Sequence, residues 1–278
     1  MLAQRLPGIL PPMSDAEAME VATLRSIVGR PMKPSEWRSR PFRSPHHTAS
    51  AAALVGGGVH PRPGEISLAH NGVLFLDELP EFDRRVLEVL REPLEAGAIT
   101  ISRAARQAEF PARFQLIAAM NPCPCGYFGD AFGSCQCTAV QVQRYRARIS
   151  GPLLDRLDLH VHVPRLEFKS LREKSGDLEG TVDVAARVKR ARELQIDRQG
   201  VCNAHLDNAA VERYCAPNAA GLAILERAMQ HLGLSARGYH RVLKVARTIA
   251  DMSGRSQIEV AQITEALALR SLDRPQAR

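Results

Sequence analysis

The sequence feature that most constrains the fold is a short apolar run that leads directly into two carboxylates. Residues 72–76 are uncharged, four of these five are large and apolar, and Asp77 and Glu78 follow at once. Such a run is typical of a strand buried on both faces of a parallel sheet. Ligands bind at the carboxyl ends of such strands, so both carboxylates are predicted at a ligand-accessible edge. The alternative is a core strand followed by a helix with an acidic first turn.

A second apolar run ends on a polar residue in the same way. Residues 114–120 read as another buried strand, and Asn121 with Pro122 follows it. If the two strands are neighbours, Asn121 lies beside Asp77 and Glu78, where it could meet a phosphate or an attacking water. The alternative is that Asn121 only turns the chain before proline, which asparagine often does.

Composition limits the class of protein and the compartment. The 278 residues can form one sizeable core or two domains, and the net charge of +7 permits contact with nucleic acid. No apolar run approaches the ~20 residues that cross a bilayer. Pro7, Pro11 and Pro12 interrupt the only stretch that could serve as a signal peptide. A cytoplasmic location with reduced thiols is therefore expected.

Four of the six cysteines are clustered in two C-x-C pairs within residues 123–137. Pro124 and Gly126 predict a tight turn at the first pair rather than a strand. Four thiolates brought together suit a tetrahedral structural Zn²⁺. Because the spacing differs from C-x-x-C, free or disulfide-prone thiols are the alternative. The predicted zinc ligands are Cys123, Cys125, Cys135 and Cys137.

Two segments of the N-terminal half carry unusual composition. Residues 29–64 are rich in Gly, Pro, Ser, His and Arg, which predicts a long loop with room for a hairpin. His46 and His47 within it are interpreted as a solvated pair. Residues 100–113 predict a polar hairpin, and between these two segments residues 83–91 predict a helix ended by Pro93. The hairpin segment carries the arginines Arg103, Arg106 and Arg113.

The C-terminal part reads as all-helical. Thr138 and Gln141 form a capping-box signal for a helix, which Ser150-Gly151-Pro152 ends. Arg156 and a further expected strand follow. Beyond a charged linker, successive helical patterns extend to residue 270. The predicted organisation is an α/β core over residues 1–170 and a small helical domain over residues 171–278.

Residues 40–50, 63–78, 121–126 and 151–156 together resemble the magnesium-chelatase-like AAA+ ATPase family, and the resemblance covers essentially the whole chain. It implies an AAA+ parallel-sheet core followed by a helical lid of the magnesium-chelatase type. The run at residues 72–78 resembles the Walker B segment of that family. The family places a G-x-x-x-x-G-K-[ST] phosphate loop directly before a segment like Met1-Leu2-Ala3, and no such motif occurs in this sequence. The chain is therefore expected to be a family member without its first strand and P-loop, and to bind and hydrolyse ATP poorly by itself.

The resemblance also implies roles for individual residues. Asp77 would help hold Mg²⁺ and Glu78 would polarise the attacking water. Asn121 matches the sensor 1 position, Arg156 the arginine finger that reaches a neighbouring subunit's ATP, and Arg237 the sensor 2 position. For Arg156 and Arg237 the alternatives are a surface ion pair and a solvated residue at a helix start.

The function that the resemblance implies is that of a ring-forming, hexameric ATPase that moves along or remodels DNA, by branch migration in recombination. The hairpin arginines would neutralise the DNA backbone in a salt-sensitive, largely sequence-independent way. Two alternatives remain open. One is the ATPase subunit of a chelatase that inserts Mg²⁺ into a porphyrin, and the other is a non-catalytic remnant.

Overall fold

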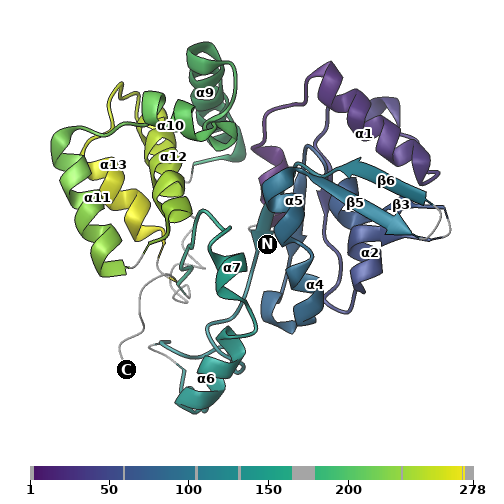
Figure 1. Ribbon diagram of the computed structural model, residues 1–278, viewed down its shortest axis with the longest axis horizontal. Helices are drawn as coiled ribbons and strands as arrows, with labels where there is room; N and C mark the ends of the chain where they lie inside the picture. Colours follow the sequence, from purple (N-terminus) through teal and green to yellow (C-terminus); the bar gives the residue numbers. More distant parts are fainter. Residues whose placement is uncertain are drawn as a thin grey trace. The chain divides into compact units, whose positions relative to one another are not determined.

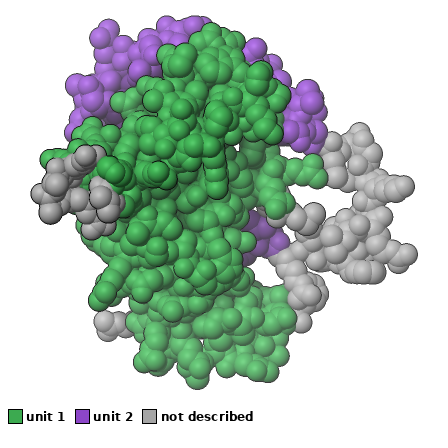
Figure 2. All heavy atoms as spheres, turned by 90° about the vertical axis from the view of Figure 1, so that its right-hand side faces the viewer, with its two compact units in different colours: residues 1–156 green, residues 157–278 purple. Residues whose placement is uncertain are grey.

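The structure is a computed structural model that describes residues 3–58, 60–103, 106–130, 133–164, 179–232, 234–270 and 272. The chain divides into two compact units, Met1–Arg156 and Leu157–Arg278, which are coloured separately in Figure 2. The domain boundary expected near residue 170 falls in residues 165–178, outside the part that the structure describes. Within the described part, no helix combines the length and the apolar character that crossing a membrane requires.

A parallel sheet lies at the centre of the first unit. Its strands are β1 (Phe42–Arg43), β4 (Val73–Leu76) and β7 (Gln115–Ala118), in the order β1-β4-β7. Both pairings are parallel, with Phe42 opposite Val73 and Leu76 opposite Ala118. Three of the four β4 side chains are fully buried, as the apolar run predicts. The unit is therefore an α/β structure with β4 as its middle strand.

The rest of this unit consists mainly of helices and short turns (Figure 1). Capping boxes at Ser14 and Thr138 fix the starts of α1 and α6, and the Thr138 box confirms its sequence prediction. Leu74, Leu87 and Leu153 belong to the apolar core that joins the sheet to the helices. The helical elements of this unit are η1 (Ala3–Gly8), α1 (Asp15–Ile27), η2 (Pro34–Glu36), α2 (Ala51–Val55), α3 (Glu65–Leu68), η3 (Leu79–Glu81), α4 (Arg84–Glu88), α5 (Arg91–Ala96), α6 (Ala139–Arg146) and α7 (Gly151–Leu154).

Residues 29–64 are more ordered than a long loop. They contain β1, helix α2 and a small antiparallel hairpin of β2 (Gly56–Gly57) and β3 (Arg62–Pro63). Strand β1 can pair with β4 because Gly72, just before β4, lets its backbone approach that of Pro41, just before β1. A Cβ at Gly72 would lie 2.0 Å from the Pro41 carbonyl oxygen, and the neighbouring Val73 N–H donates to that oxygen at 2.8 Å.

The helix expected over residues 83–91 is wrong in its extent. Helix α4 stops at Glu88, and a second helix, α5, starts at Arg91 with Pro93 in its first turn. Proline is tolerated there because the first N–H groups of a helix have no partner within the helix. Pro93 therefore helps to start a helix instead of ending one.

The polar segment forms the predicted hairpin. Strands β5 (Ala98–Arg103) and β6 (Arg106–Pro111) pair antiparallel from Ala98–Pro111 at the base to Arg103–Arg106 at the tip. The hairpin reaches the edge of this unit in Figure 1. The side chains of Arg103 and Arg106 lie outside the described part.

The second unit is mainly helical in its described part from Thr181 onward. Its core is formed mainly by α10 (Asn208–Tyr214), α11 (Ala219–Leu232), α12 (Ala236–Met252) and α13 (Val260–Ala268). Val211, Leu225 and Leu243 are among its buried members. The strand expected after Arg156 is not found within residues 157–164; only an isolated bridge joins His160 to Arg270. The elements are α9 (Thr181–Gln199), η4 (Asn203–His205), α10 (Asn208–Tyr214), α11 (Ala219–Leu232), α12 (Ala236–Met252) and α13 (Val260–Ala268).

Candidate functional site

The carboxyl ends of β4 and β7 bring the two acidic residues and the asparagine to one edge of the sheet. The Ala119 N–H donates to the Leu76 carbonyl oxygen at 2.9 Å, and the Leu79 N–H donates to the Ala119 carbonyl oxygen at 2.9 Å. The segments that follow β4 and β7 thus remain hydrogen-bonded to each other beyond the ends of the strands. Asp77 and Glu78 leave the sheet at this edge, and Asn121 follows two residues after Ala119.

Glu78 has an unusual backbone conformation. Its φ of 52° and ψ of 46° lie in the left-handed region, which few residues other than glycine adopt. The Glu78 N–H donates to Asp77 Oδ1 at 3.0 Å, and the Glu78 carbonyl oxygen accepts from the Glu81 N–H at 2.7 Å. These bonds turn the chain sharply from β4 into η3. Both carboxylates remain exposed, so a ligand can reach them.

Two further side chains meet this edge. His47, which follows β1, lies with Nδ1 3.0 Å from Glu78 Oε2. The Tyr145 pKa is raised, first by burial and then by the negative charges of Glu81 and Glu78, although an N–H of Asn121 donates to its oxygen and opposes the rise. The edge therefore combines carboxylates, an imidazole and a phenol contributed by three segments. Sequence reasoning missed His47 because β1 was not recognised as a strand of this sheet. It also missed Tyr145, which lies on α6, far along the chain from both strands.

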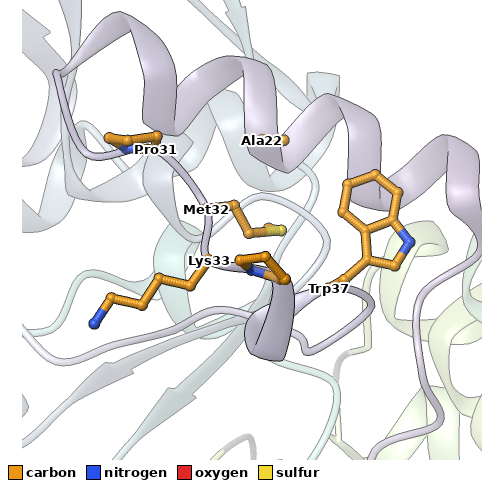
Figure 3. Close-up of a pocket in the computed structure, with 6 residues that line it drawn as sticks. Ala22, Pro31, Met32, Lys33 and Trp37 are labelled. Atoms are coloured by element: carbon orange, nitrogen blue, oxygen red, sulfur yellow. The ribbon is translucent and has the colours of Figure 1, made fainter.

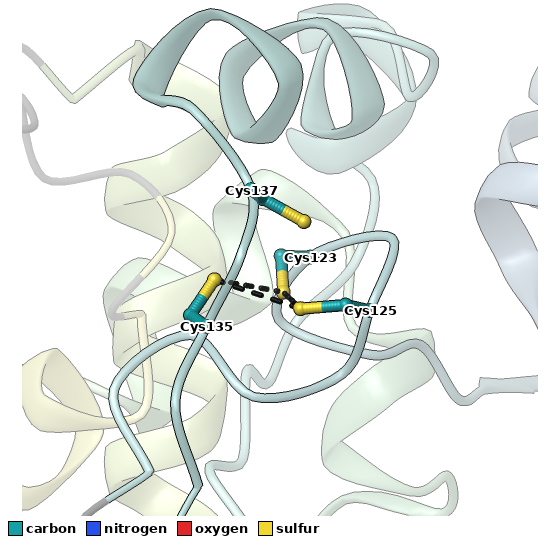
Figure 4. A group of neighbouring side chains, drawn as sticks. All are labelled: Cys123, Cys125, Cys135 and Cys137. Carbon is teal, nitrogen blue, oxygen red and sulfur yellow. Dashed lines mark hydrogen bonds between the residues drawn. The ribbon is translucent and has the colours of Figure 1, made fainter.

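The four clustered cysteines lie directly after Asn121. Their sulfur atoms all lie within 4.8 Å of one another (Figure 4). The Sγ–Sγ distances are 3.3 Å for Cys123–Cys125, 3.7 Å for Cys123–Cys135 and 3.6 Å for Cys125–Cys135. All four are free thiols, and the first pair sits in a turn as predicted. Gly126 closes that turn with a φ of +84°, and a Cβ built there would lie 4.0 Å from Asn121 Cγ.

Backbone N–H groups point at several of these sulfurs. The N–H groups of Tyr127 and Gln136 donate to Cys125 Sγ, and together with the Cys123 thiol they lower the pKa of the Cys125 thiol to about 6. An N–H of Cys125 donates to Cys137 Sγ, yet desolvation and the neighbouring thiols raise the pKa of Cys137 to about 12. Without a cation, one thiolate suppresses ionisation of the next. Cys202 and Cys215 belong to the second unit and are not members of the cluster, and burial raises the pKa of Cys215 to about 11.

Arg156 is held inside its own unit. Its guanidinium donates to Glu95 Oε2 at 2.5 Å, to the Pro152 carbonyl oxygen at 2.7 Å and to the Arg91 carbonyl oxygen at 3.2 Å. The side chain is buried. In this conformation Arg156 connects α5 to α7.

The other predicted site residues lie elsewhere. Arg113 is at the base of the hairpin, where its N–H donates to His70 Nδ1 at 3.0 Å and its carbonyl oxygen accepts from the Asn71 N–H. This is the amino end of β4, opposite to the edge that carries Asp77. Arg237 is exposed in the first turn of α12, in the second unit. The structure therefore groups Asp77, Glu78 and Asn121 but does not group Arg113 with them.

Hollows also occur among the described residues of the first unit. A shallow groove beside the edge is lined by His47, Thr48, Ala49, Ser50, Ala51, Glu81, Asp83, Arg85, Val86 and Arg148. A second, apolar hollow lies under α1, where Met32 and Trp37 face it while the Lys33 side chain extends away (Figure 3). The groove adjoins the sheet edge, because His47 lines it and also meets Glu78.

Comparison with known proteins agrees with the geometry. The family model described as magnesium chelatase, subunit ChlI, matches residues 1–171, and the model for the ChlI C-terminal region matches residues 178–270. The competence protein ComM of Haemophilus influenzae is 51% identical over 99% of this chain, which covers 53% of ComM. YifB of Salmonella typhimurium is 49% identical over 99% of this chain and 54% of its own length. The DNA replication licensing factor Mcm6 of Drosophila melanogaster is 29% identical over 45% of this chain and 15% of its own length.

The chain spans about half the length of the curated relatives that match it along its whole extent. The two family models together cover both compact units. With this coverage and these identities, the chain belongs to the magnesium-chelatase-like AAA+ family.

Proposed function

We propose that this chain supplies the metal-binding, water-activating and sensing groups of an AAA+ site that hydrolyses ATP to remodel DNA. The observation that carries the proposal is the shared edge: neighbouring parallel strands end in Asp77-Glu78 and, a few residues later, in Asn121. Ligands of open α/β sheets bind at this end of the strands.

The groups at the edge fit Mg²⁺ with a triphosphate. Asp77 and Glu78 offer exposed carboxylate oxygens, the donor type that Mg²⁺ prefers, and Mg²⁺ is commonly held by one or two carboxylates plus substrate phosphates. Asp77 is the proposed metal ligand. A bound Mg²⁺ would neutralise phosphate charge. Glu78 would orient and polarise the attacking water, and the Asn121 amide would hydrogen-bond the terminal phosphate or that water.

A chimera tests this proposal directly. The sequence contains no P-loop motif, so this chain would replace the matched region of H. influenzae ComM, with which it shares 51% identity. Glu78→Gln in that chimera is expected to lower ATP turnover by roughly 10²–10⁴-fold, the usual range for a lost acid–base group, with ATP binding retained. Glu92→Gln, at an exposed position on α5, is the matched control and keeps the parent rate. Unchanged turnover in Glu78→Gln would contradict the proposal.

DNA is the proposed substrate. The proposed activity is ATP-dependent branch migration or helicase movement in recombination and competence. Support comes from the net charge of +7, from the β5–β6 hairpin with an arginine at each side of its tip, and from the relatives named for competence and DNA replication. Arg103 and Arg106 are the proposed phosphate contacts at the tip. Arg113 lies at the hairpin base and contributes less.

A gel shift at several salt concentrations tests the DNA proposal. Replacing Arg103 and Arg106 by Ala is expected to weaken binding and to reduce the salt slope by about 0.9 for each lost phosphate contact. Arg84→Ala with Arg144→Ala removes the same charge at exposed helix positions and serves as the control. Equal loss in both double variants would show that only net charge matters and would contradict a hairpin contact.

The ring assembly, the cytoplasmic location and the roles of two arginines remain predictions. Arg237, exposed on α12, is proposed as sensor 2. Arg156 is proposed as the arginine finger on the family pattern alone, and that role requires its bonds to Glu95 and the two carbonyl groups to exchange on assembly. Sedimentation of the chimera with ATP, with and without Arg156→Ala, tests both the ring and the finger.

A chelatase ATPase subunit is the second candidate, because both matching family models carry that name. A non-catalytic remnant is the third. Salt-dependent DNA binding favours the first proposal over the chelatase, and ATP turnover by the chimera excludes the remnant.

We also propose that the four clustered cysteines hold a structural Zn²⁺. Zinc–sulfur bonds of ~2.3 Å in a tetrahedron separate sulfurs by about 3.8 Å, close to the 3.3–3.7 Å between three of the pairs here. The N–H groups directed at the sulfurs favour thiolates. A bound zinc would brace the turn that follows Asn121.

Metal analysis of the chain purified without chelators tests the zinc proposal, with one zinc per chain expected. Cys135→Ser with Cys137→Ser is expected to lose the metal and to lower the thermal midpoint. Cys202→Ser, which lies outside the cluster, is expected to keep both. A folded, metal-free parent protein would contradict the proposal.

A further inference from the structure

Two exposed aromatic side chains lie on the loop that the cysteine cluster closes. Tyr127 is 45% exposed and Phe128 is 46% exposed, although aromatic residues make up only 5% of the chain. Both lie between Cys125 and Cys135, so the cluster holds the two ends of their loop together. Among the described residues, Trp37 is the other aromatic side chain that is similarly exposed. Two adjacent exposed rings on one loop are typical of a binding surface.

The Tyr127 ring is held in place although it is not buried. A Cβ built at Gly133 would lie 2.3 Å from Tyr127 Cδ1, so the backbone of the returning loop packs directly against this ring. The Tyr127 N–H donates to Cys125 Sγ, and the Tyr127 carbonyl oxygen accepts from the Asp130 N–H at 3.1 Å. The ring therefore has little conformational freedom left to lose when a partner binds.

The Phe128 ring is held by an arginine of α6. Arg146 Cζ lies 5.2 Å from the centre of this ring, which is a cation–π contact, and Arg146 Nε donates to the Pro122 carbonyl oxygen at 3.2 Å. The terminal nitrogens of Arg146 make no hydrogen bond to any other described residue. They can therefore donate to a phosphate that approaches the ring.

The charge beside the rings favours an anionic partner. Residues 121–149 contain three arginines and a single carboxylate, that of Asp130, and one of the arginines, Arg148, is paired with Glu81. Four thiolates outweigh the charge of one Zn²⁺, so an anion is expected beside Arg146 and not at the sulfur atoms. Nucleic acid combines anionic groups with flat rings. Unpaired bases stack on aromatic side chains, whereas the bases of a duplex already stack on one another.

We propose that Tyr127, Phe128 and Arg146 form a contact for single-stranded DNA, in which unpaired bases stack on the rings and the guanidinium meets a phosphate. This inference rests on the proposed action on DNA and adds a surface separate from the β5–β6 hairpin. The hairpin arginines would neutralise the phosphates of any strand. The aromatic loop would instead select strands whose bases are unpaired, which branch migration and helicase movement both expose.

Fluorescence anisotropy of the 278-residue chain with labelled oligothymidine, and with a labelled duplex of matched length, tests this contact. Phe128→Ala and Tyr127→Ala are each expected to weaken oligothymidine binding by about five- to a hundred-fold, the range for one stacked base, with duplex binding within about two-fold. Arg146→Ala should reduce the salt slope for oligothymidine by about 0.7. Trp37→Ala removes an exposed ring elsewhere in the same unit and is the control that keeps the parent affinities.

Two further substitutions at Phe128 separate stacking from general hydrophobic contact. Phe128→Leu keeps an apolar side chain but removes the ring, so it should lose affinity as Phe128→Ala does. Phe128→Trp keeps an aromatic face and should bind oligothymidine at least as tightly as the parent. Thermal midpoints equal to that of the parent would show that the substitutions act on binding and not on folding.

Parent-like oligothymidine binding in both alanine variants, or equal weakening for single strand and duplex, would overturn the inference. A Phe128→Leu variant that binds as the parent would overturn stacking as its basis. Altered self-association with unchanged oligothymidine binding would also overturn it and would show that the rings pack against a second copy of this chain. A parent chain that binds neither DNA would contradict the proposed action on DNA itself, and this inference with it.

Discussion

Two groups of charged side chains in this molecule are built in opposite ways. At the sheet edge of the first unit, Glu78 is 55% exposed and its side chain meets His47. In the second unit, Asp251 is 2% exposed and accepts from Arg198, Asn203 and Arg247 at 2.6–3.0 Å. The buried group is surrounded by its own donors, whereas the edge carboxylates keep oxygens open toward solvent. The exposed carboxylates at the sheet edge suit a ligand, and the buried network around Asp251 stabilises the fold.

The pKa of Asp251 expresses the same contrast. Burial raises the pKa of this carboxyl, but hydrogen bonds from Arg198 and Asn203 and the charges of Arg247 and Arg198 lower it below its ordinary value overall. Arg247 also donates to the carbonyl oxygens of Ser256 and Arg255, so the network ties α12 to the chain that follows it.

The largest effect that would sharpen the comparison is expected from Asp251→Ala. Two arginines would lose their shared carboxylate in a buried site, which typically costs about 3–5 kcal/mol. Amide hydrogen exchange in α12 should accelerate accordingly. Asp77→Ala at the edge should change the unfolding free energy by no more than about 0.5 kcal/mol, as read by fluorescence of Trp37, the single tryptophan. Similar losses in both variants would break the comparison.

A smaller effect is expected from the two asparagines. Asn203 is buried, donates to Thr248 and Asp251, and accepts from Arg198 and Gln199 at 2.9 Å. Asn203→Ala should destabilise the second unit by about 1–3 kcal/mol, because partners are left unsatisfied.

The matched change at the edge is Asn121→Ala. It is expected to leave stability nearly unchanged and to reduce ATP turnover by the chimera. Chemical unfolding and turnover should be measured on both variants. An Asn121→Ala variant that is destabilised yet fully active would reverse the assignment.

The smallest expected effect is the loss of stability at low pH when Asp251 becomes protonated. Because the folded-state pKa of Asp251 is lowered, its stabilising contribution is complete above the unfolded value near 3.8 and is lost as pH falls through the folded value. Urea unfolding followed by circular dichroism should therefore show stability declining below about pH 4. Asp251→Asn should make that decline shallower, and an identical pH profile in the variant would contradict this origin.

Much of the fold could be predicted from local signals. The apolar run at residues 72–76 identified β4, and the capping residue Thr138 located the start of α6. These features depend on a few neighbouring residues, so the sequence contains them directly. The positions of Asp77 and Asn121 after adjacent strands follow from the same kind of pattern.

Features that depend on distant partners could not be predicted. Strand β1 is two residues long and is recognised only through its pairing with β4, 31 positions later in the register. The partner of Glu78 was missed with it. Arg156 and Glu95 are likewise 61 residues apart, and no local pattern indicates that they bond. In each case, tertiary packing decides what the local sequence leaves open.

The left-handed backbone at Glu78 has a consequence for how this protein could be improved or damaged. Glycine would adopt that conformation without steric cost, so a screen that rewards heat resistance alone would be expected to enrich Glu78→Gly. Under the proposed function, the recovered protein would resist heat better but would lack the carboxylate that polarises the attacking water. A thermostability campaign on this scaffold should therefore hold position 78 fixed.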